Sequence, residues 1–218
     1  MNIFYTSTCP LQSADWLCDE HLHKMPLESV QLLSTLVRHK ISNHDWLDSI
    51  GIYKLTHDKH PSYLWLTLSS ANYQWLVDHV RQMQARYNSA YSDHDSFYVL
   101  DTIEDLYARG ILKFPTSEPT NIHLAMGKKM RSKKDPDPFL DIKQKYAEYK
   151  DGLWIANTPE DGALAYQEYV CRKLFLPTKK VDKVAGNMRL PVWRSGHPEW
   201  YKPHHSTYEH STYTNLYL

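Results

Sequence analysis

The segment Cys18-Asp-Glu-His-Leu-His-Lys-Met-Pro-Leu-Glu28 decides how the first part of this chain folds. It leads into an apolar series whose helical spacing predicts a helix to about residue 39. The series consists of Leu27, Val30, Leu33, Leu36 and Val37. Pro26 fits either the first turn of this helix or a kink within one long helix.

Four polar residues of this segment share one face of the expected helix. Residues three or four apart in a helix are neighbours, so His21, Lys24, Glu28 and Gln31 form a single stripe. An imidazole, an amine and a carboxylate on one stripe provide the groups needed for acid–base or imine chemistry. The same spacing also suits an ordinary surface ion pair between Lys24 and Glu28 on a solvated face.

The remaining pattern predicts a mainly α fold in a single domain, residues 1–218. Asn2–Tyr5 is expected to be a short strand or an extended arm, and residues 41–60 a loop with short helical pieces. Further helices are expected over 11–22, from Ser69 or Ser70 to near 87, over 101–109, and from a Thr158 cap to about 174. No convincing alternating pattern predicts a strand.

We divide this domain into a helical core with the catalytic helix (1–110), a basic, proline-containing loop region (111–142), and a helix with an aromatic and basic tail (143–218).

Composition narrows the class of protein. The chain has only seven glycines and lacks both glycine-rich phosphate-binding motifs. Its three cysteines form no C-x-x-C pair, which is typical of free thiols in a reducing cytosol. The first residues do not resemble a signal peptide, and no apolar run approaches 18 residues. We therefore expect a soluble protein of the cytoplasm with no membrane partner.

Charge is unevenly distributed although the total is neutral. Residues 1–120 carry 9 basic and 14 acidic side chains, whereas residues 121–194 carry 15 basic and 9 acidic ones. A basic segment of this kind favours a polyanionic partner such as DNA. The cations expected to contact phosphate are Lys128, Lys129, Arg131, Lys133 and Lys134, extended by Arg172, Lys173 and Arg194. The alternative for the run 128–134 is a solvated loop.

The tail interleaves aromatic residues with cations. Trp200, Tyr201 and Lys202 are expected to bind substrate, because aromatic rings stack on bases while cations contact phosphate, and Gln31 of the stripe is expected to bind it too. Aromatic residues in a tail can equally pack it onto the core. Thirteen histidines occur, but no zinc-binding motif accompanies them, so we expect no metal site.

Two resemblances rest on these residues. The opening Met-Asn-Ile-Phe, with Cys18-Asp-x-His-x-x-Lys-Met-x-x-Glu28, resembles a group of phage-encoded proteins of poorly defined function, over roughly the first 90 residues. Asp19-Glu-His-Leu22 with Glu28, together with Pro198-Glu-Trp-Tyr-Lys202, is similar to the phage pyrimidine-dimer DNA glycosylases of the endonuclease V type.

The second resemblance implies a compact, helical, cofactor-free enzyme whose N-terminal α-amine attacks C1′ of a damaged nucleotide. It implies that Glu28 supports the imine and elimination steps, that His21 is the histidine of the first helix, and that Trp200, Tyr201 and Lys202 lie near the damaged pair. In that family the initiator methionine is removed before a small residue. Asn2 is a poor context for removal, so the amine would belong to Met1, with Lys24 as the other candidate.

We therefore expect a DNA-base enzyme that flips a pyrimidine out of duplex DNA. The reaction expected is N-glycosidic cleavage at a damaged or modified pyrimidine, with or without AP-lyase activity. If the chain is phage-encoded, it would act in the cytoplasm of the host cell. One alternative is a phage transferase that attaches an amino acid or polyamine to an activated pyrimidine. The other is a non-catalytic nucleic-acid-binding protein in which the stripe is surface.

Overall fold

A computed structural model describes residues 2–91, 98–127, 137–175, 193 and 196–201, without the side chains of 173–175. The prediction of a mainly α fold is confirmed over these residues. The elements are α1 (Pro10–Asp15), α2 (Asp19–Lys40), α3 (His44–Ser49), α4 (Pro61–Leu68), α5 (Ser70–Tyr91), α6 (Tyr98–Ala108), α7 (Leu140–Tyr146), β1 (Ala147–Lys150), β2 (Leu153–Ala156) and α8 (Pro159–Phe175).

Helix α2 carries the predicted stripe and is continuous. Pro26 lies inside it, so the alternative of one long helix is correct. Proline removes only one backbone hydrogen bond, while Asp19 and Glu20 in the first turn and the basic residues of the last turn complement the helix dipole. The helix therefore tolerates Pro26 and holds the whole stripe on one rigid element.

The expected helix over 11–22 is wrong, because the chain leaves helical geometry between α1 and α2. Cys18 is extended and precedes the first turn of α2. The guanidinium of Arg86, on α5, donates hydrogen bonds to the carbonyls of Ala14 and Leu17. This donor satisfies carbonyls that a continuing helix would have used, and it lies about seventy residues away in the sequence.

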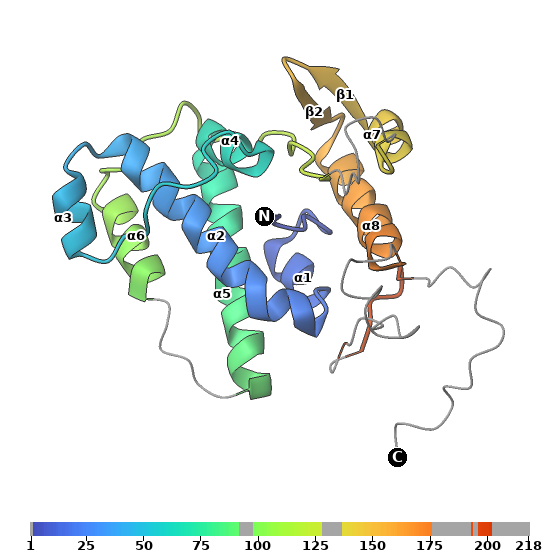
Figure 1. The fold of residues 1–218 in the computed structure, drawn as a ribbon, viewed down its shortest axis with the longest axis horizontal. Helices are drawn as coiled ribbons and strands as arrows, with labels where there is room; N and C mark the ends of the chain where they lie inside the picture. Colours follow the sequence, from blue (N-terminus) through green and yellow to red (C-terminus); the bar gives the residue numbers. More distant parts are fainter. Residues whose placement is uncertain (1, 92–97, 128–136, 176–192, 194–195, 202–218) are drawn as a thin grey trace, which may run out of the picture.

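The first layer of the fold packs α1, α2 and α4 against α5, which crosses behind α2, while α6 packs against α2 (Figure 1). Its centre is apolar and fully buried, with Leu33, Leu36, Leu76, Val80 and Ile103 all 0% exposed. Helix α5 runs to Tyr91, beyond the expected end near residue 87, and its Tyr87 and Tyr91 rings pack on His23 of α2. Tertiary contact thus extends the helix.

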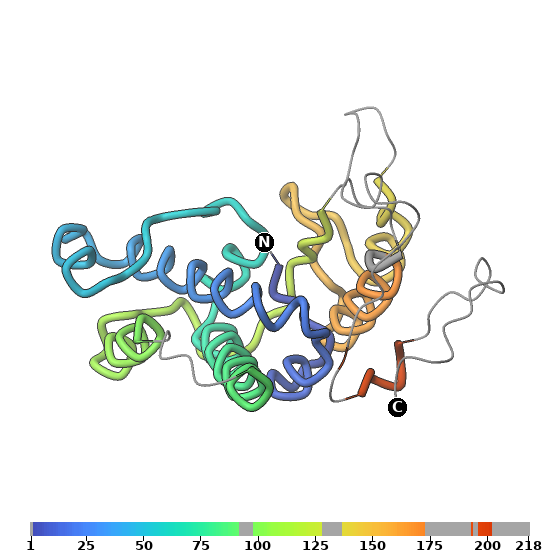
Figure 2. The backbone as a smooth tube through the Cα atoms, turned by 60° about the horizontal axis from the view of Figure 1, so that its bottom comes forward, coloured from blue at the N-terminus to red at the C-terminus, as the bar shows by residue number. Residues whose placement is uncertain are grey.

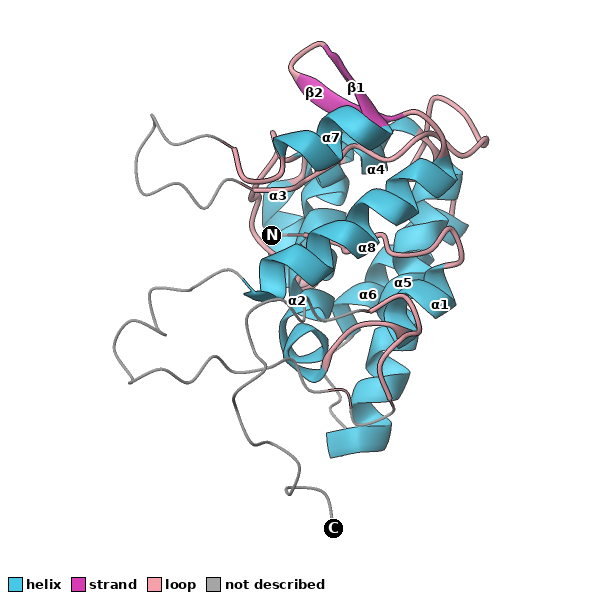
Figure 3. Cartoon of the chain, turned by 90° about the vertical axis from the view of Figure 1, so that its right-hand side faces the viewer, coloured by secondary structure: helices cyan, strands magenta, loops and turns pink. Residues whose placement is uncertain are grey.

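The second layer contains α7, the β1–β2 hairpin and α8, on the other side of the N-terminus in Figure 1. The hairpin pairs Tyr149 with Trp154 and turns at Asp151-Gly152, both at positive φ. An Asp-Gly pair favours such a turn, but four-residue strands are too short to give a clear alternating pattern. In Figure 3 the hairpin and α7 lie at one end of the molecule and the end of α5 at the other.

The chain start, residues 2–7, is an irregular, buried arm between the two layers (Figure 2). Ile3 and Phe4 are at most 1% exposed and join the same apolar core as Val170 of α8. Of the two expectations for this segment, residues 2–7 form an arm and not a strand, and the arm turns at Phe4, whose φ is 47°. The arm places the beginning of the chain at the centre of the fold.

Other expected boundaries agree closely with the structure. Residues 41–60 are loop apart from α3. Thr158 accepts a hydrogen bond from the backbone N–H of Asp161 at 3.0 Å, as a helix cap does, and α8 follows it. Among the described helices, none combines the length and the apolar character needed to cross a membrane.

Candidate active site

The N-terminal arm is fixed by hydrogen bonds from several elements. The Asn2 side chain donates to the carbonyl of Ala125 at 2.9 Å and accepts from the N–H of Phe4 at 2.8 Å. Farther along, Thr6 N–H donates to Ser13 Oγ at 3.0 Å, and Gln167 of α8 donates to the Thr6 carbonyl at 2.9 Å. The arm therefore has a defined position relative to α1, α8 and the loop before residue 128.

Glu28 meets the very beginning of this arm. The backbone N–H of Asn2 donates to Glu28 Oε2 at 3.2 Å, although 26 residues separate the two in the sequence. Met1 lies outside the described residues. The charge of the chain's α-amine nevertheless acts on the Glu28 carboxylate, whose pKa it lowers.

Lys24 contacts the other oxygen of the same carboxylate, with Nζ 2.9 Å from Glu28 Oε1. Burial tends to raise the pKa of Glu28. The hydrogen bond from Lys24, the positive charges of the chain's α-amine and of Lys24, and the hydrogen bond from Asn2 N–H outweigh burial, so the pKa is lowered overall. Glu28 is therefore an anion at neutral pH and is suited to accept a proton or to stabilise a positive charge.

The Glu28 carboxylate lies at the border between the core and solvent. Its side chain is 12% exposed, whereas that of Lys24 is 68% exposed. A substrate that displaced Lys24 could reach the carboxylate without unfolding the helix. Lys24 and Glu28 thus form the ion pair that their spacing predicts. The Glu28 carboxylate also contacts the N-terminal arm.

His21 and Gln31 complete the stripe with different surroundings. The His21 ring stacks on Phe4 of the arm, with centroids 4.1 Å apart and planes at 22°. Phe4 has a φ of 47°, a left-handed geometry that is costly for a side chain of this size. Gln31, one turn beyond Glu28, is partly exposed. Three of the four residues therefore form one group at the arm, since His21 and Glu28 contact the arm and Lys24 contacts Glu28.

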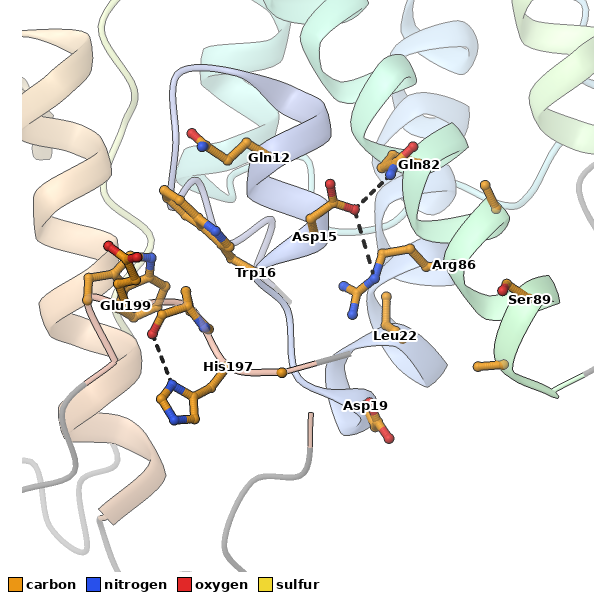
Figure 4. A pocket seen from close by; sticks show the side chains of 15 residues that line it. Gln12, Asp15, Trp16, Asp19, Leu22, Gln82, Arg86, Ser89, His197 and Glu199 are labelled. Atoms are coloured by element: carbon orange, nitrogen blue, oxygen red, sulfur yellow. Dashed lines mark hydrogen bonds and ion pairs between the residues drawn. The ribbon is translucent and has the colours of Figure 1, made fainter. Parts of the chain in front are cut away.

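Trp200 and Tyr201 belong to a different part of the surface. A cleft of about 1180 Å³ lies between α1, the first turn of α2, the end of α5 and residues 196–200 (Figure 4). Trp16 and Trp200 line it, with ring centroids 5.8 Å apart. Tyr201 is buried, and its ring lies 4.4 Å from that of Trp193. The cleft lining does not include Glu28.

The polar side of this cleft has a structural role. In Figure 4, Gln82 and Arg86 of α5 both contact Asp15 of α1. Because Arg86 also donates to the carbonyls at the end of α1, its cation is occupied in holding α1 against α5. The tryptophans are the parts of the lining most suited to a base or another flat ligand.

Most of the predicted DNA-contacting cations lie outside the described residues, including Lys128, Lys129, Arg131, Lys133, Lys134, Arg194 and Lys202, as does the side chain of Lys173. Arg172 is described, and it pairs with Asp141 at 2.7 Å and Glu168 at 3.0 Å. A phosphate would have to compete with these two carboxylates for Arg172.

Sequence reasoning missed two residues that organise the region, Asn2 and Arg86. Both act through contacts to backbone groups that are distant in the sequence, at Ala125 for Asn2 and at Ala14 and Leu17 for Arg86. No local pattern signals such contacts. Within the described ranges, no group of three or more His, Cys, Asp or Glu side chains is placed to hold a metal ion.

Comparisons with known proteins add no relative: no protein-family model, curated protein or solved structure matches this chain.

Proposed function

We propose that this protein is a DNA N-glycosylase with associated lyase activity that acts on damaged or modified pyrimidines. The nucleophile is the α-amine at the start of the chain, and Glu28 is the catalytic carboxylate. Lys24 is the alternative nucleophile, since it also contacts Glu28.

The observation that carries this proposal is the hydrogen bond from Asn2 N–H to Glu28 Oε2. Extended chain starts usually lie at the surface, where few contacts order them. Here the start is buried and its first described amide is bonded to an ionised carboxylate. An amine beside a carboxylate base is the arrangement that imine chemistry requires.

The reaction follows from these groups. The amine nitrogen forms a bond to C1′ while the bond from C1′ to the pyrimidine breaks, and its electron pair leaves with the base, which takes up a proton. Glu28 accepts the proton that the attacking amine loses. Opening of the sugar ring then gives an imine at C1′ and a hydroxyl at C4′. Removal of a C2′ proton from this imine expels the 3′ phosphate and cleaves the strand.

Charge and chain connectivity support DNA as the partner. Gly127 is the last described residue before the basic run, and Ala125, two residues earlier, accepts a hydrogen bond from Asn2. The run of cations therefore follows, in the sequence, a segment that contacts the arm. Phosphate contacts from this run would hold the duplex close to the carboxylate.

The decisive experiment is borohydride trapping on UV-irradiated duplex DNA and on duplex DNA with modified pyrimidines. An imine is reduced to a stable secondary amine, so the wild-type protein should become covalently attached to DNA. Intact mass first establishes which residue carries the α-amine, and peptide mapping then assigns the adduct to that amine or to Lys24. Lys24→Arg serves as the control that retains the positive charge.

Nucleoside mass analysis of the same reactions distinguishes the alternatives. Release of a free pyrimidine together with trapping supports the proposal. A mass increase on the pyrimidine without release identifies a transferase, and binding with neither product identifies a non-catalytic DNA-binding protein. Either of these two results would refute glycosylase activity.

A further inference from the structure

Asn2 makes more contacts than an ordinary residue at the start of a chain. The residue is 4% exposed, and its side chain bridges the Ala125 carbonyl and the Phe4 N–H, at 2.9 and 2.8 Å. Tyr169 of α8 also hydrogen-bonds with the Asn2 side chain, as well as with the backbone of Gly127. One side chain thus ties the arm to α8 and to the loop before residue 128.

These contacts determine where the backbone nitrogen of Asn2 lies. The bond to Phe4 N–H closes a local turn, and this turn accompanies the left-handed geometry of Phe4 and its stacking on His21 of α2. With its side chain held from two sides, Asn2 presents its own N–H to Glu28. Loss of the side-chain contacts would release the chain start from the carboxylate.

We propose that Asn2 is a positioning residue that holds the chain's α-amine against Glu28. We call the hydrogen bonds of the Asn2 side chain the clamp. Its catalytic consequence rests on the proposed function, but the clamp itself is a property of the free protein. Orientation of reacting groups contributes strongly to catalysis, and a displacement of about 1 Å can reduce a rate by about 10²-fold.

Asparagine is suited to this position for a chemical reason. It supplies one donor for the Ala125 carbonyl and one acceptor for the Phe4 N–H in a single neutral side chain. Aspartate would retain the acceptor, lose the donor and place a second negative charge near Glu28. Leucine has a similar size and would lose the hydrogen bonds to Ala125, Phe4 and Tyr169.

The test compares Asn2→Leu and Asn2→Asp with the wild type. These substitutions keep a large residue after the initiator methionine, whereas alanine would promote its removal and so change the amine itself. Ser13→Ala is the matched control, because Ser13 fixes the arm only at Thr6 and the Phe4 carbonyl, away from the amine. Thermal unfolding of each variant confirms that it is folded.

The first measurement needs no DNA. The rate of acylation of the α-amine by a dilute active ester is followed by peptide mass analysis, with exposed lysines as internal standards. We expect Asn2→Leu and Glu28→Gln to increase this rate by about fivefold or more, the scale of one lost hydrogen bond, and Ser13→Ala to leave it unchanged. An unchanged rate in Asn2→Leu would overturn the clamp.

The second measurement is single-turnover trapping on DNA. We expect Asn2→Leu to lower the rate by about 10²-fold with unchanged DNA affinity, and Asn2→Asp to lower it less because the Phe4 bond remains. Equal losses in Asn2→Leu and Ser13→Ala would show a merely structural role. If acylation changes as expected but no DNA is trapped by the wild type, the clamp is supported and the proposed function is refuted.

Discussion

The middle of α2 and its first turn differ in how their polar groups are held. At the middle, Glu28 is nearly buried and bonded to both Lys24 and the arm. At the first turn, Asp19 and Leu22 line an open cleft, and the packed pair of Trp16 and Trp200 forms part of its wall. The first region has fixed polar geometry around a nearly buried carboxylate, and the second has open space beside an aromatic wall.

The sequence assigns catalysis and base stacking to one site, whereas the structure holds the residues for these two tasks in different places. Groups that stabilise a transition state must be oriented beforehand, which the contacts around Glu28 provide. A cleft lined by Trp16 and Trp200 is instead suited to contact a ligand through ring faces. We therefore expect substitutions at Glu28 to affect turnover and substitutions in the cleft to affect binding.

The largest effect is expected for Glu28→Gln. The substitution keeps the size of the side chain but removes the charge and the ability to accept a proton, so single-turnover trapping should fall by about 10²–10⁴-fold. Glu20→Gln, at an exposed position in the first turn of the same helix, is the control. DNA affinity should change little in either variant. A trapping rate near that of the wild type would remove Glu28 from the mechanism.

Stability of the arm region should depend on pH through His79. This α5 side chain is 0% exposed and lies 3.0 Å from the Pro10 carbonyl, below the arm and α1. Burial lowers its pKa to about 4, against opposing hydrogen bonds to the backbone of Pro10 and Ile3. The unfolded chain therefore takes up a proton near pH 6.5 that the folded protein does not.

The contribution of His79 to the free energy of unfolding should accordingly be fully present above pH 6.5 and should decrease as the pH falls from 6.5 towards 4. By pH 4.5 the decrease due to His79 should be roughly 2–3 kcal/mol. Urea unfolding at pH 7.5 and 4.5 measures it, and His79→Gln should reduce the difference because glutamine does not titrate. His44→Gln, on the exposed surface of α3, is the control. An equal pH difference in all three proteins would contradict this assignment.

Helix positions were largely predictable because they depend on local spacing. The stripe on α2, the Thr158 cap and the short helix in 41–60 all follow from residues close in the sequence. The break between α1 and α2 could not be predicted in this way, because the carbonyls of Ala14 and Leu17 accept hydrogen bonds from Arg86, which is distant in the sequence. The hairpin was missed because its strands have only four residues each.

The candidate site was predictable only in part. Periodicity correctly placed His21, Lys24 and Glu28 on one face of a helix. It could not show that Glu28 contacts Asn2, since this contact depends on how the two layers enclose the arm. Nor could it show that Trp200 lies in a cleft whose lining excludes Glu28, because that separation arises only from the packing of residues 196–200.

Removal of the basic run should weaken DNA binding without affecting lesion discrimination. Replacing Lys128, Lys129, Lys133 and Lys134 by alanine should reduce the slope of log affinity against log salt by about 0.9 for each lost phosphate contact. Binding titrations from 50 to 200 mM salt measure the slope. The matched control replaces Lys40, Lys54, Lys59 and Lys113, four lysines of the acidic part of the chain. Equal slopes in the two variants would mean that the run makes no specific phosphate contact.

The smallest effect is expected for Trp200→Ala in the cleft. Stacking of one base on an aromatic ring contributes about 1–3 kcal/mol, and because Trp200 is partly buried against Trp16 we expect only about tenfold weaker binding of damaged DNA. Affinity for undamaged duplex should hardly change, since that affinity comes from phosphate contacts. Trp46→Ala is the control, as this tryptophan is 39% exposed on α3, away from the cleft. Equal weakening for damaged and undamaged DNA would show that Trp200 only docks the tail, and the cleft would then have no part in recognising the base.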